Sequence, residues 1–200
     1  MNPATRSSRS LLWMLRAALL FAGVLLPPAL ASTACASDRP IQVGLGTGSR
    51  SFENRLDLTT EAGVGLRLGL GLNRNVTLLL DAIQATPTRK TTNQLARVTA
   101  LRSLIQVGYS VGPVRPYIVG GAGGILFDFN DTADAAGGAF TGGLGIEWRV
   151  ARQIAVFGEG SIDWYRSRTV LYGVNGEELS SSPRTTDQAR TIEAGVLASF

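Results

Sequence analysis

Residues 62 to 72 alternate strictly between two kinds of side chain. Every second residue is apolar and the residues between are glycine or arginine, in the order Ala62, Gly63, Val64, Gly65, Leu66, Arg67, Leu68, Gly69, Leu70, Gly71 and Leu72. An amphipathic helix repeats its apolar residues at intervals of three and four rather than two. The segment is therefore predicted to be a β-strand with one wide apolar face and a second face of glycine and a single charge.

The same alternation recurs along the chain, and we expect each occurrence to form one strand. The segments lie near residues 41–48, 60–72, 76–84, 95–111, 115–129, 139–150, 153–165 and 191–200. Ser103 interrupts the apolar face of the fourth segment and leaves its register open. An even number of strands suits a closed antiparallel barrel with both ends on the same side. The predicted fold class is all-β, an eight-stranded up-and-down transmembrane barrel.

The predicted connections differ in length in a regular way. Short ones at 73–75, 111–116 and 151–152 alternate with longer polar ones at 49–59, 85–93, 130–138 and 166–190. Outer-membrane barrels have short periplasmic turns and longer external loops. The alternation therefore favours a barrel in the cell outer membrane.

Aromatic residues are expected to form two belts at the two membrane interfaces. Next to short turns or the C-terminus we place Tyr109, Tyr117, Trp148 and Phe200, and next to long loops Phe127, Phe129, Phe140 and Trp164. In this interpretation all eight side chains face lipid. A strand of ten residues tilted by about 40° crosses ~25 Å, the height of the apolar band.

The N-terminal region has the pattern of a secretory signal peptide. Three arginines precede an apolar run at residues 17–26, followed by Pro27 and Pro28 and then by small residues. Ten apolar residues fall short of the ~20 that a spanning helix needs. We expect residues 1–36 to be the signal, with cleavage after Ala31 or Ala36, and residues 37–200 to be the barrel.

Charge excludes one class of function. The whole chain has 19 basic and 15 acidic residues, and removal of Arg6, Arg9 and Arg16 with the signal would leave 16 against 15. The remaining arginines are dispersed, so we expect no nucleic acid as a partner. The single cysteine, Cys35, lies within the expected signal, and the residues before it lack the aliphatic residue of a lipoprotein signal.

Several segments resemble the small eight-stranded outer-membrane barrels of the OmpA, OmpX and OmpW type. The resemblance lies in the glycine and aromatic patterns of residues 114–124, 142–149 and 157–165. The last strand resembles the C-terminal assembly signal of such proteins at Glu193, Gly195, Ala198 and Phe200. The resemblance implies a monomer that meets outer-membrane lipid, lipopolysaccharide and, during insertion, the barrel-assembly machinery.

Charged residues on the inward faces are expected to form an ion-pair network in the lumen, since an eight-stranded barrel is only wide enough for its own side chains. The candidates are Arg67, Asp81, Arg102, Glu147, Arg149, Glu159, Asp163 and Glu193, with Gln106 beside them. A second interpretation is a gate, in which arginines exchange partners and open a narrow conduit.

Catalysis is not expected, because the chain has no histidine to serve as general base. Glu159 and Asp163 share one face, but four residues of strand separate their Cα atoms by ~13 Å, too far for a carboxylate dyad. We expect no catalytic residue, cofactor or metal site.

Three functions therefore remain open. The favoured one is a structural role or an interaction at the envelope surface. The alternatives are a small passive channel for ions or small hydrophobic molecules, and a soluble lipocalin-like binding barrel with the leucines of 62–72 inside. Basic loop residues could bind lipopolysaccharide phosphates. They are Arg89, Lys90, Arg166, Arg168 and Arg184.

Overall fold

The computed structural model describes residues 41–53, 57–91, 93, 95–129, 133–172, 178–181 and 185–200. The expected signal peptide lies outside these residues, so that expectation stays a prediction. Within the described ranges, a search for helices long and apolar enough to cross a bilayer finds none.

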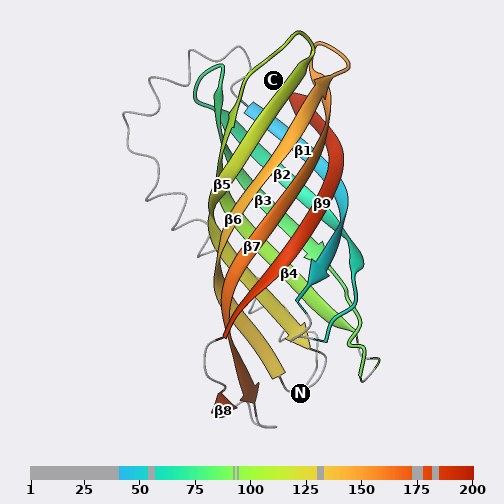
Figure 1. Ribbon diagram of the computed structural model, residues 1–200, viewed down its shortest axis with the longest axis vertical. Helices are drawn as coiled ribbons and strands as arrows, with labels where there is room; N and C mark the ends of the chain where they lie inside the picture. Colours follow the sequence, from blue (N-terminus) through green and yellow to red (C-terminus); the bar gives the residue numbers. More distant parts are fainter. Residues whose placement is uncertain are drawn as a thin grey trace.

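Eight antiparallel strands close into a barrel (Figure 1). They are β1 (Ile41–Phe52), β2 (Glu61–Gly71), β3 (Val76–Ala85), β4 (Ala96–Gly108), β5 (Val114–Phe129), β6 (Ala133–Arg149), β7 (Ile154–Tyr172) and β9 (Thr185–Ser199). Each pairs with its neighbours in the chain, and β9 pairs with both β7 and β1 to complete the ring. A short strand, β8 (Glu178–Ser181), pairs with β7 outside this ring. The predicted fold class is confirmed.

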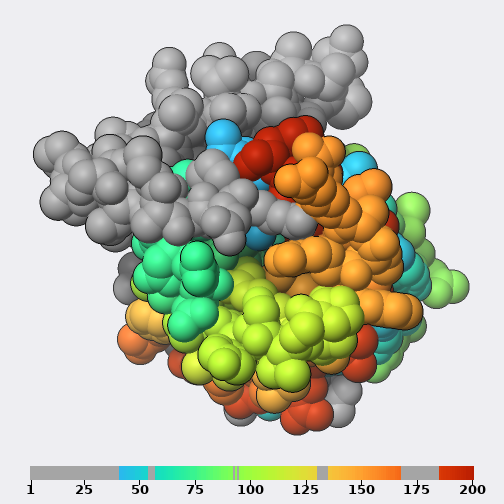
Figure 2. Space-filling model, turned by 90° about the horizontal axis from the view of Figure 1, so that it is seen from above, coloured from blue at the N-terminus to red at the C-terminus, as the bar shows by residue number. Residues whose placement is uncertain are grey.

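The short turns gather at one end of the barrel, which Figure 2 views from above. In the first of them the Asn73 side chain accepts hydrogen bonds from the backbone N–H groups of Asn75 and Val76, at 2.8 and 2.9 Å. Such a turn fixes the register of the two strands that it joins. Arg67 on β2 therefore lies directly opposite Asp81 on β3.

Several strands are longer at the opposite end than the alternation predicted. β1 continues to Phe52 because its residues pair with β2 as far as Arg50 and with β9 as far as Phe52. The predicted loop at 166–190 is mostly strand, since β7 and β9 remain paired as far as Ser167 and Thr185. The expected loop boundaries at 49 and 166 were therefore wrong.

The leucine face of β2 points outward. Val64 is 67 % exposed and Leu66 45 %, whereas Arg67 between Leu66 and Leu68 is 2 % exposed. A lipocalin-like barrel would place those leucines inside, so that alternative is wrong. The outward apolar face is the one that lipid covers in a membrane barrel.

On β5 the predicted orientation is inverted. Tyr117, Phe127 and Phe129 are buried in the lumen, and Ile118 points outward at 64 % exposure. In its middle the outward face of β5 has only Gly120, Ala122 and Gly124, which made the inward face look like the lipid side. The two belts lose these three residues and keep exposed aromatics at each end. They are Tyr109, Trp148 and Phe200 near the short turns, and Phe140 and Trp164 toward the long loops.

Candidate functional site

A buried cluster of charged and polar side chains crosses the lumen, and all eight barrel strands contribute to it. Its members are Arg50 (β1), Arg67 (β2), Asp81 (β3), Arg102 (β4), Tyr117 (β5), Thr141 (β6), Glu159, Ser161 and Asp163 (β7) and Glu193 (β9). Strand alternation turns these residues inward while their chain neighbours face lipid. We call this set the lumen cluster.

Ion pairs connect the lumen cluster in a continuous chain. Arg50 Nη2 donates to Asp163 Oδ2 at 2.6 Å. Arg102 lies between two carboxylates, with Nη1 3.4 Å from Asp163 Oδ1 and Nη2 donating to Asp81 Oδ2. Arg67 Nη2 reaches the same Asp81 oxygen at 3.4 Å. Asp81 and Asp163 thus each join two arginines.

Arg67 is the most connected cation of the lumen cluster. Besides Asp81, it donates from Nη1 to Glu159 Oε2 at 2.9 Å, and its Nη2 lies 3.6 Å from Glu193 Oε2. Its guanidinium also lies over the Phe157 ring, 4.5 Å from the centroid, which is a favourable cation–π distance. Removing this one side chain would affect three carboxylates.

Two acids of the lumen cluster face each other, a pairing that sequence reasoning missed. Glu159 and Glu193 are directly opposite each other on β7 and β9, where Cβ atoms are about 5 Å apart. Tyr117 donates its hydroxyl to Glu159 at 3.0 Å and Arg67 contacts both acids. Like charges opposite each other are destabilising, so this pair depends on Arg67.

Arg149 and Glu147 lie apart from the lumen cluster. Arg149, the last residue of β6, is exposed beside a short turn and takes no part in the described ion pairs, so its placement in the network was wrong. Alternation alone cannot tell that the barrel has ended there. Glu147 instead pairs with Arg115 at 3.2 Å and accepts from Gln106 Nε2 at 2.6 Å, nearer the short turns.

Arg50, Tyr117 and Thr141 were not among the predicted site residues. Arg50 was assigned to a loop because the outward residues beside it are serines rather than apolar residues. Tyr117 was assigned to the lipid face. Thr141 Oγ1 donates to Asp163 Oδ1 at 2.6 Å. The only sequence signal for Thr141 was its position among the alternate residues of the sixth segment that face inward.

Apolar layers bound the lumen cluster on both sides. Toward the long loops, Phe127, Phe129 and Tyr165 pack with Leu58 and several alanines. Toward the short turns there are two groups, one of Leu79, Leu104, Tyr117 and Val119, the other of Ala155, Phe157 and Leu197. The same order is found along β7. From the long-loop end toward the short turns, its inward residues include Tyr165, then Asp163 and Glu159, then Phe157. The lumen is thus filled along its length.

A clasp between two loops holds Leu58 in the mouth. Backbone N–H groups of Lys90 and Thr59 donate to the carbonyls of Asp57 and Thr88 at 2.8 and 2.9 Å. Asp57 has a φ of 53°, a left-handed conformation that aspartate adopts more readily than most residues. Hydrogen bonds from the Thr91 hydroxyl and backbone N–H keep the pKa of the Asp57 carboxyl below its ordinary value of 3.8.

The basic loop residues are distributed rather than gathered. Arg89 stacks on Phe129, with its guanidinium 4.5 Å from the ring centroid, while Lys90 and Arg166 are exposed. The Arg168 side chain and Arg184 lie outside the described part of the structure.

The residues that resemble an assembly signal lie on both faces of β9. Glu193 belongs to the lumen cluster and Phe200 points outward. The backbone at Gly195 lies very close to that of β1. Ala198 lies on the outward face and is partly buried.

Comparison with known proteins identifies the architecture. The sequence profile of the outer membrane protein beta-barrel domain matches residues 17–200. Among solved structures, Neisserial surface protein A (NspA) has a TM-score of 0.60 at 10 % identity, over 80 % of this chain and 97 % of that one. OprG from Pseudomonas aeruginosa has a TM-score of 0.57 at 12 % identity, over 82 % and 98 %. A major outer membrane protein from Thermus thermophilus has 0.54 at 11 %, over 80 % and 99 %. No curated protein matches the sequence. At these identities the likeness to solved structures concerns the fold.

Proposed function

The chain belongs to the outer membrane protein beta-barrel domain family, and from this premise we propose that it is a closed, non-catalytic barrel with a structural or surface-interaction role in the outer membrane. The observation that carries the proposal is the filled lumen. Buried charges occupy its middle and apolar layers lie on both sides of them. A passive conduit needs a continuous polar path, and this arrangement leaves little room for one.

Planar-bilayer recording tests the closed-barrel proposal. We expect no single-channel conductance from the purified protein across voltages of both signs, with a general porin in the same bilayer as positive control. Insertion is checked separately by comparing boiled and unboiled samples on a detergent gel. Discrete conductance steps from an inserted barrel would overturn the closed-barrel proposal.

A second candidate function, a gated channel, has one observation in its favour. Arg67 already contacts Asp81, Glu159 and Glu193, so it has alternative partners within reach. If arginine exchange opens a path, the recording should give rare openings that become frequent in Arg67→Ala. Silence in both proteins would remove the channel.

In the proposed surface role, the long-loop end of the barrel is the part that binds lipopolysaccharide. Lys90 and Arg166 are exposed there, and arginine and lysine both bind the phosphates that lipopolysaccharide carries. A Lys90→Ala/Arg166→Ala double variant should bind lipopolysaccharide vesicles more weakly. Arg152→Ala, at an exposed turn of the opposite end, serves as control and should bind as the unmodified protein does.

We further propose that the barrel is monomeric and that the barrel-assembly machinery recognises its last strand during insertion. Phe200 supports this, since it points outward while its backbone N–H donates to the Ile41 carbonyl at 3.0 Å across the closing seam. Phe200→Ala should therefore slow insertion by purified assembly machinery. The control Tyr109→Ala, an exposed aromatic of the same end, should leave the insertion rate unchanged.

A further inference from the structure

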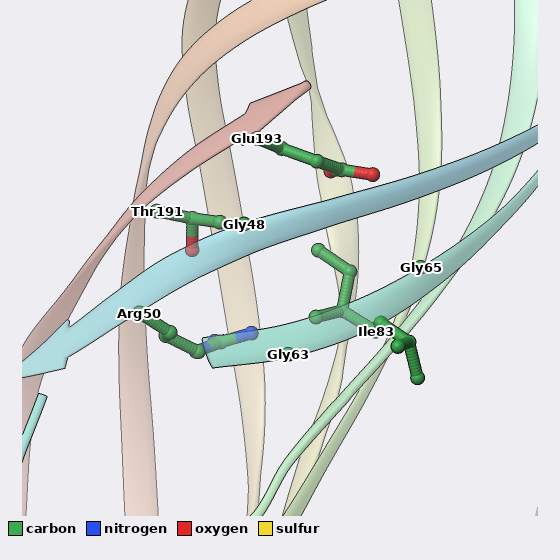
Figure 3. Close-up of a pocket in the computed structure, with 8 residues that line it drawn as sticks. Gly48, Arg50, Gly63, Gly65, Ile83, Thr191 and Glu193 are labelled. Carbon is green, nitrogen blue, oxygen red and sulfur yellow. The ribbon is translucent and has the colours of Figure 1, made fainter. Parts of the chain in front are cut away.

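Two exposed arginines, Arg166 on β7 and Arg190 on β9, lie on the outer wall of the barrel, and we call them the arginine pair. Thr191 and Glu193 of β9 are turned into the lumen (Figure 3), so alternation places Arg190 on the opposite, outward face. Arg166 lies between two buried residues of β7 and faces outward in the same way. Within the part of the chain that the structure describes, neither guanidinium takes part in an ion pair.

The arginine pair lies at the level where the headgroups of the outer leaflet begin. Phe200 marks the short-turn side of the apolar band, and Arg190 is ten residues before it on β9. Ten residues cover ~33 Å of strand and, at a tilt of about 40°, ~25 Å along the membrane normal, which is the height of the apolar band. Trp164, an exposed aromatic of the same end, lies between the two arginines in the strand register. The two positive charges therefore meet the layer of lipid that carries phosphate.

The spacing of the arginine pair favours a ligand with two anionic groups. Arg190 is directly opposite Ile162, four residues before Arg166 on β7. Four residues of strand span ~13 Å and neighbouring strands are ~5 Å apart, so the two Cα atoms are ~14 Å apart. In their described residues, the outward faces of β7 and β9 have no acid to compete for the arginines. Uncharged polar residues surround them instead, with Ser51 opposite Arg190, Gln188 opposite Trp164 and Thr186 opposite Arg166.

A strip of wall without side chains leads from the arginine pair toward the middle of the apolar band. Gly160 and Gly158 form it on β7, and a Cβ atom added at either would meet nothing within 4 Å. Leu144 on β6 and Ile192 on β9 lie on either side of Gly160 and project into the lipid, with exposures of 68 % and 73 %. An acyl chain can lie on this strip between the two projecting side chains.

We propose that this part of the wall binds one molecule of a bisphosphorylated, acylated glycolipid of the outer leaflet, which is the chemistry of lipid A. Arg190 and Arg166 each bind one of its phosphates, and an acyl chain lies over Gly160. Lipid A has a phosphate at each end of a disaccharide, and arginine is suited to bidentate contact with phosphate. The inference rests on the proposed binding of lipopolysaccharide and assigns it a site on the membrane-facing wall rather than in the loops alone.

Binding of lipid A to the purified barrel in detergent micelles, measured by native mass spectrometry, tests the wall site. Arg190→Gln should weaken binding about tenfold or more, because charge-assisted hydrogen bonds to a phosphate are lost. Arg190→Lys keeps the charge and should lose less. Arg97→Gln is the matched control, since Arg97 is an exposed arginine of the same end with Asp128 directly opposite. It should bind as the unmodified protein does, and unboiled gel samples show that each variant is folded.

Two further comparisons identify the ligand as a bisphosphorylated lipid. Lipid A with a single phosphate should bind the unmodified barrel more weakly than the bisphosphorylated form does. Gly160→Leu fills the strip without changing either arginine, so it should also weaken the binding of lipid A. An affinity unchanged in Gly160→Leu would show a site for phosphate alone and overturn the lipid site.

The outcomes separate the wall site from the proposed surface role. Equal affinities of Arg190→Gln and Arg97→Gln for lipid A would overturn the wall site. If the Lys90→Ala/Arg166→Ala variant nevertheless binds lipopolysaccharide vesicles more weakly, the surface role stands and only the wall site fails. If that variant also binds as the unmodified protein does, both proposals fail.

Discussion

Replacing Arg67 by methionine tests whether the lumen cluster depends on a single cation. Arg67 is 2 % exposed and its guanidinium lies within 3.6 Å of three carboxylates, those of Asp81, Glu159 and Glu193. Methionine keeps much of the length and removes the charge. Breaking a buried ion pair by removing one partner costs about 3–5 kcal/mol, because the other charge stays buried. We expect a loss of that size in the free energy of unfolding.

The Glu159–Glu193 pair makes the prediction sharper. If the two carboxylates are as far apart as facing Cβ atoms, about 5 Å, they repel by about 3 kcal/mol at an effective dielectric constant of about 20. The 3.6 Å contact between Arg67 and Glu193 attracts by about 5 kcal/mol on the same scale. Glu193→Gln alone should therefore destabilise the protein by about 2 kcal/mol or less. In the Arg67→Met background the same change should stabilise it by about 3 kcal/mol.

Urea unfolding in lipid vesicles measures these free energies. Trp148 and Trp164 are exposed on the outer wall at opposite ends of the barrel, so their fluorescence reports loss of insertion. Arg149→Met is the matched control, because it is the same substitution at an exposed arginine outside the lumen cluster. It should change the free energy by no more than about 0.5 kcal/mol. An Arg67→Met cost equal to that of the control, or a Glu193→Gln effect of the same sign in both backgrounds, would refute the reasoning.

Three further changes test other parts of the structure. In Gly195→Ala the added Cβ would lie 2.2 Å from the Leu45 carbonyl oxygen, whereas at Gly158 it would meet nothing within 4 Å. The folded fraction on unboiled gels should therefore fall in the first variant and persist in Gly158→Ala. Leu66→Arg on the lipid face should destabilise the barrel in vesicles by about 2–4 kcal/mol more than Leu66→Ala does, and equal costs would contradict a membrane location for that face. Hydrogen bonds from Thr91 lower the pKa of the Asp57 carboxyl, so these bonds stabilise the clasp when the carboxyl is ionised. This stabilisation is fully present above the ordinary pKa of 3.8 and is lost as pH falls through the lowered value. The protection factor of the Thr91 amide, its exchange relative to the intrinsic rate at each pH, should fall over that acid range, and in Asp57→Asn it should not depend on pH there.

Local sequence was enough to predict the barrel and the inward side of most strands. On β2 the two faces differ so strongly that Leu66 and Arg67 admit one orientation. On β5 they do not differ in this way, since both faces are apolar or small. The large aromatic residues of β5 were therefore predicted to face lipid, whereas Phe127 fills the mouth of the lumen. An eight-stranded barrel uses apolar side chains inside as well as outside, so hydrophobicity alone does not assign the face.

Which charges meet depends on how far apart their strands are in the chain. Arg67 and Asp81 flank a short turn, so their pairing follows from the hairpin register. Glu159 and Glu193 lie on strands joined by a long connection, and no local rule fixes their register. Arg50 reaches Asp163 over 113 residues. These contacts arise only when the ring closes, which is why the grouping could be predicted but not the partners.

The lumen cluster specifies register more than it adds stability. Buried ion pairs often contribute little net stability compared with well-packed apolar residues. A slip of β2 by one residue, however, would turn Arg67 toward lipid and Leu66 into the lumen, because side chains alternate strictly. Arginine at the bilayer midplane costs about 2–4 kcal/mol, and the carboxylates left inside would lose their partner. Since each of the eight strands places at least one group in the cluster, a slip anywhere carries such a penalty. We infer that these residues exclude closures in which a strand is shifted by one residue, because the shifted strand would then turn its polar groups toward lipid.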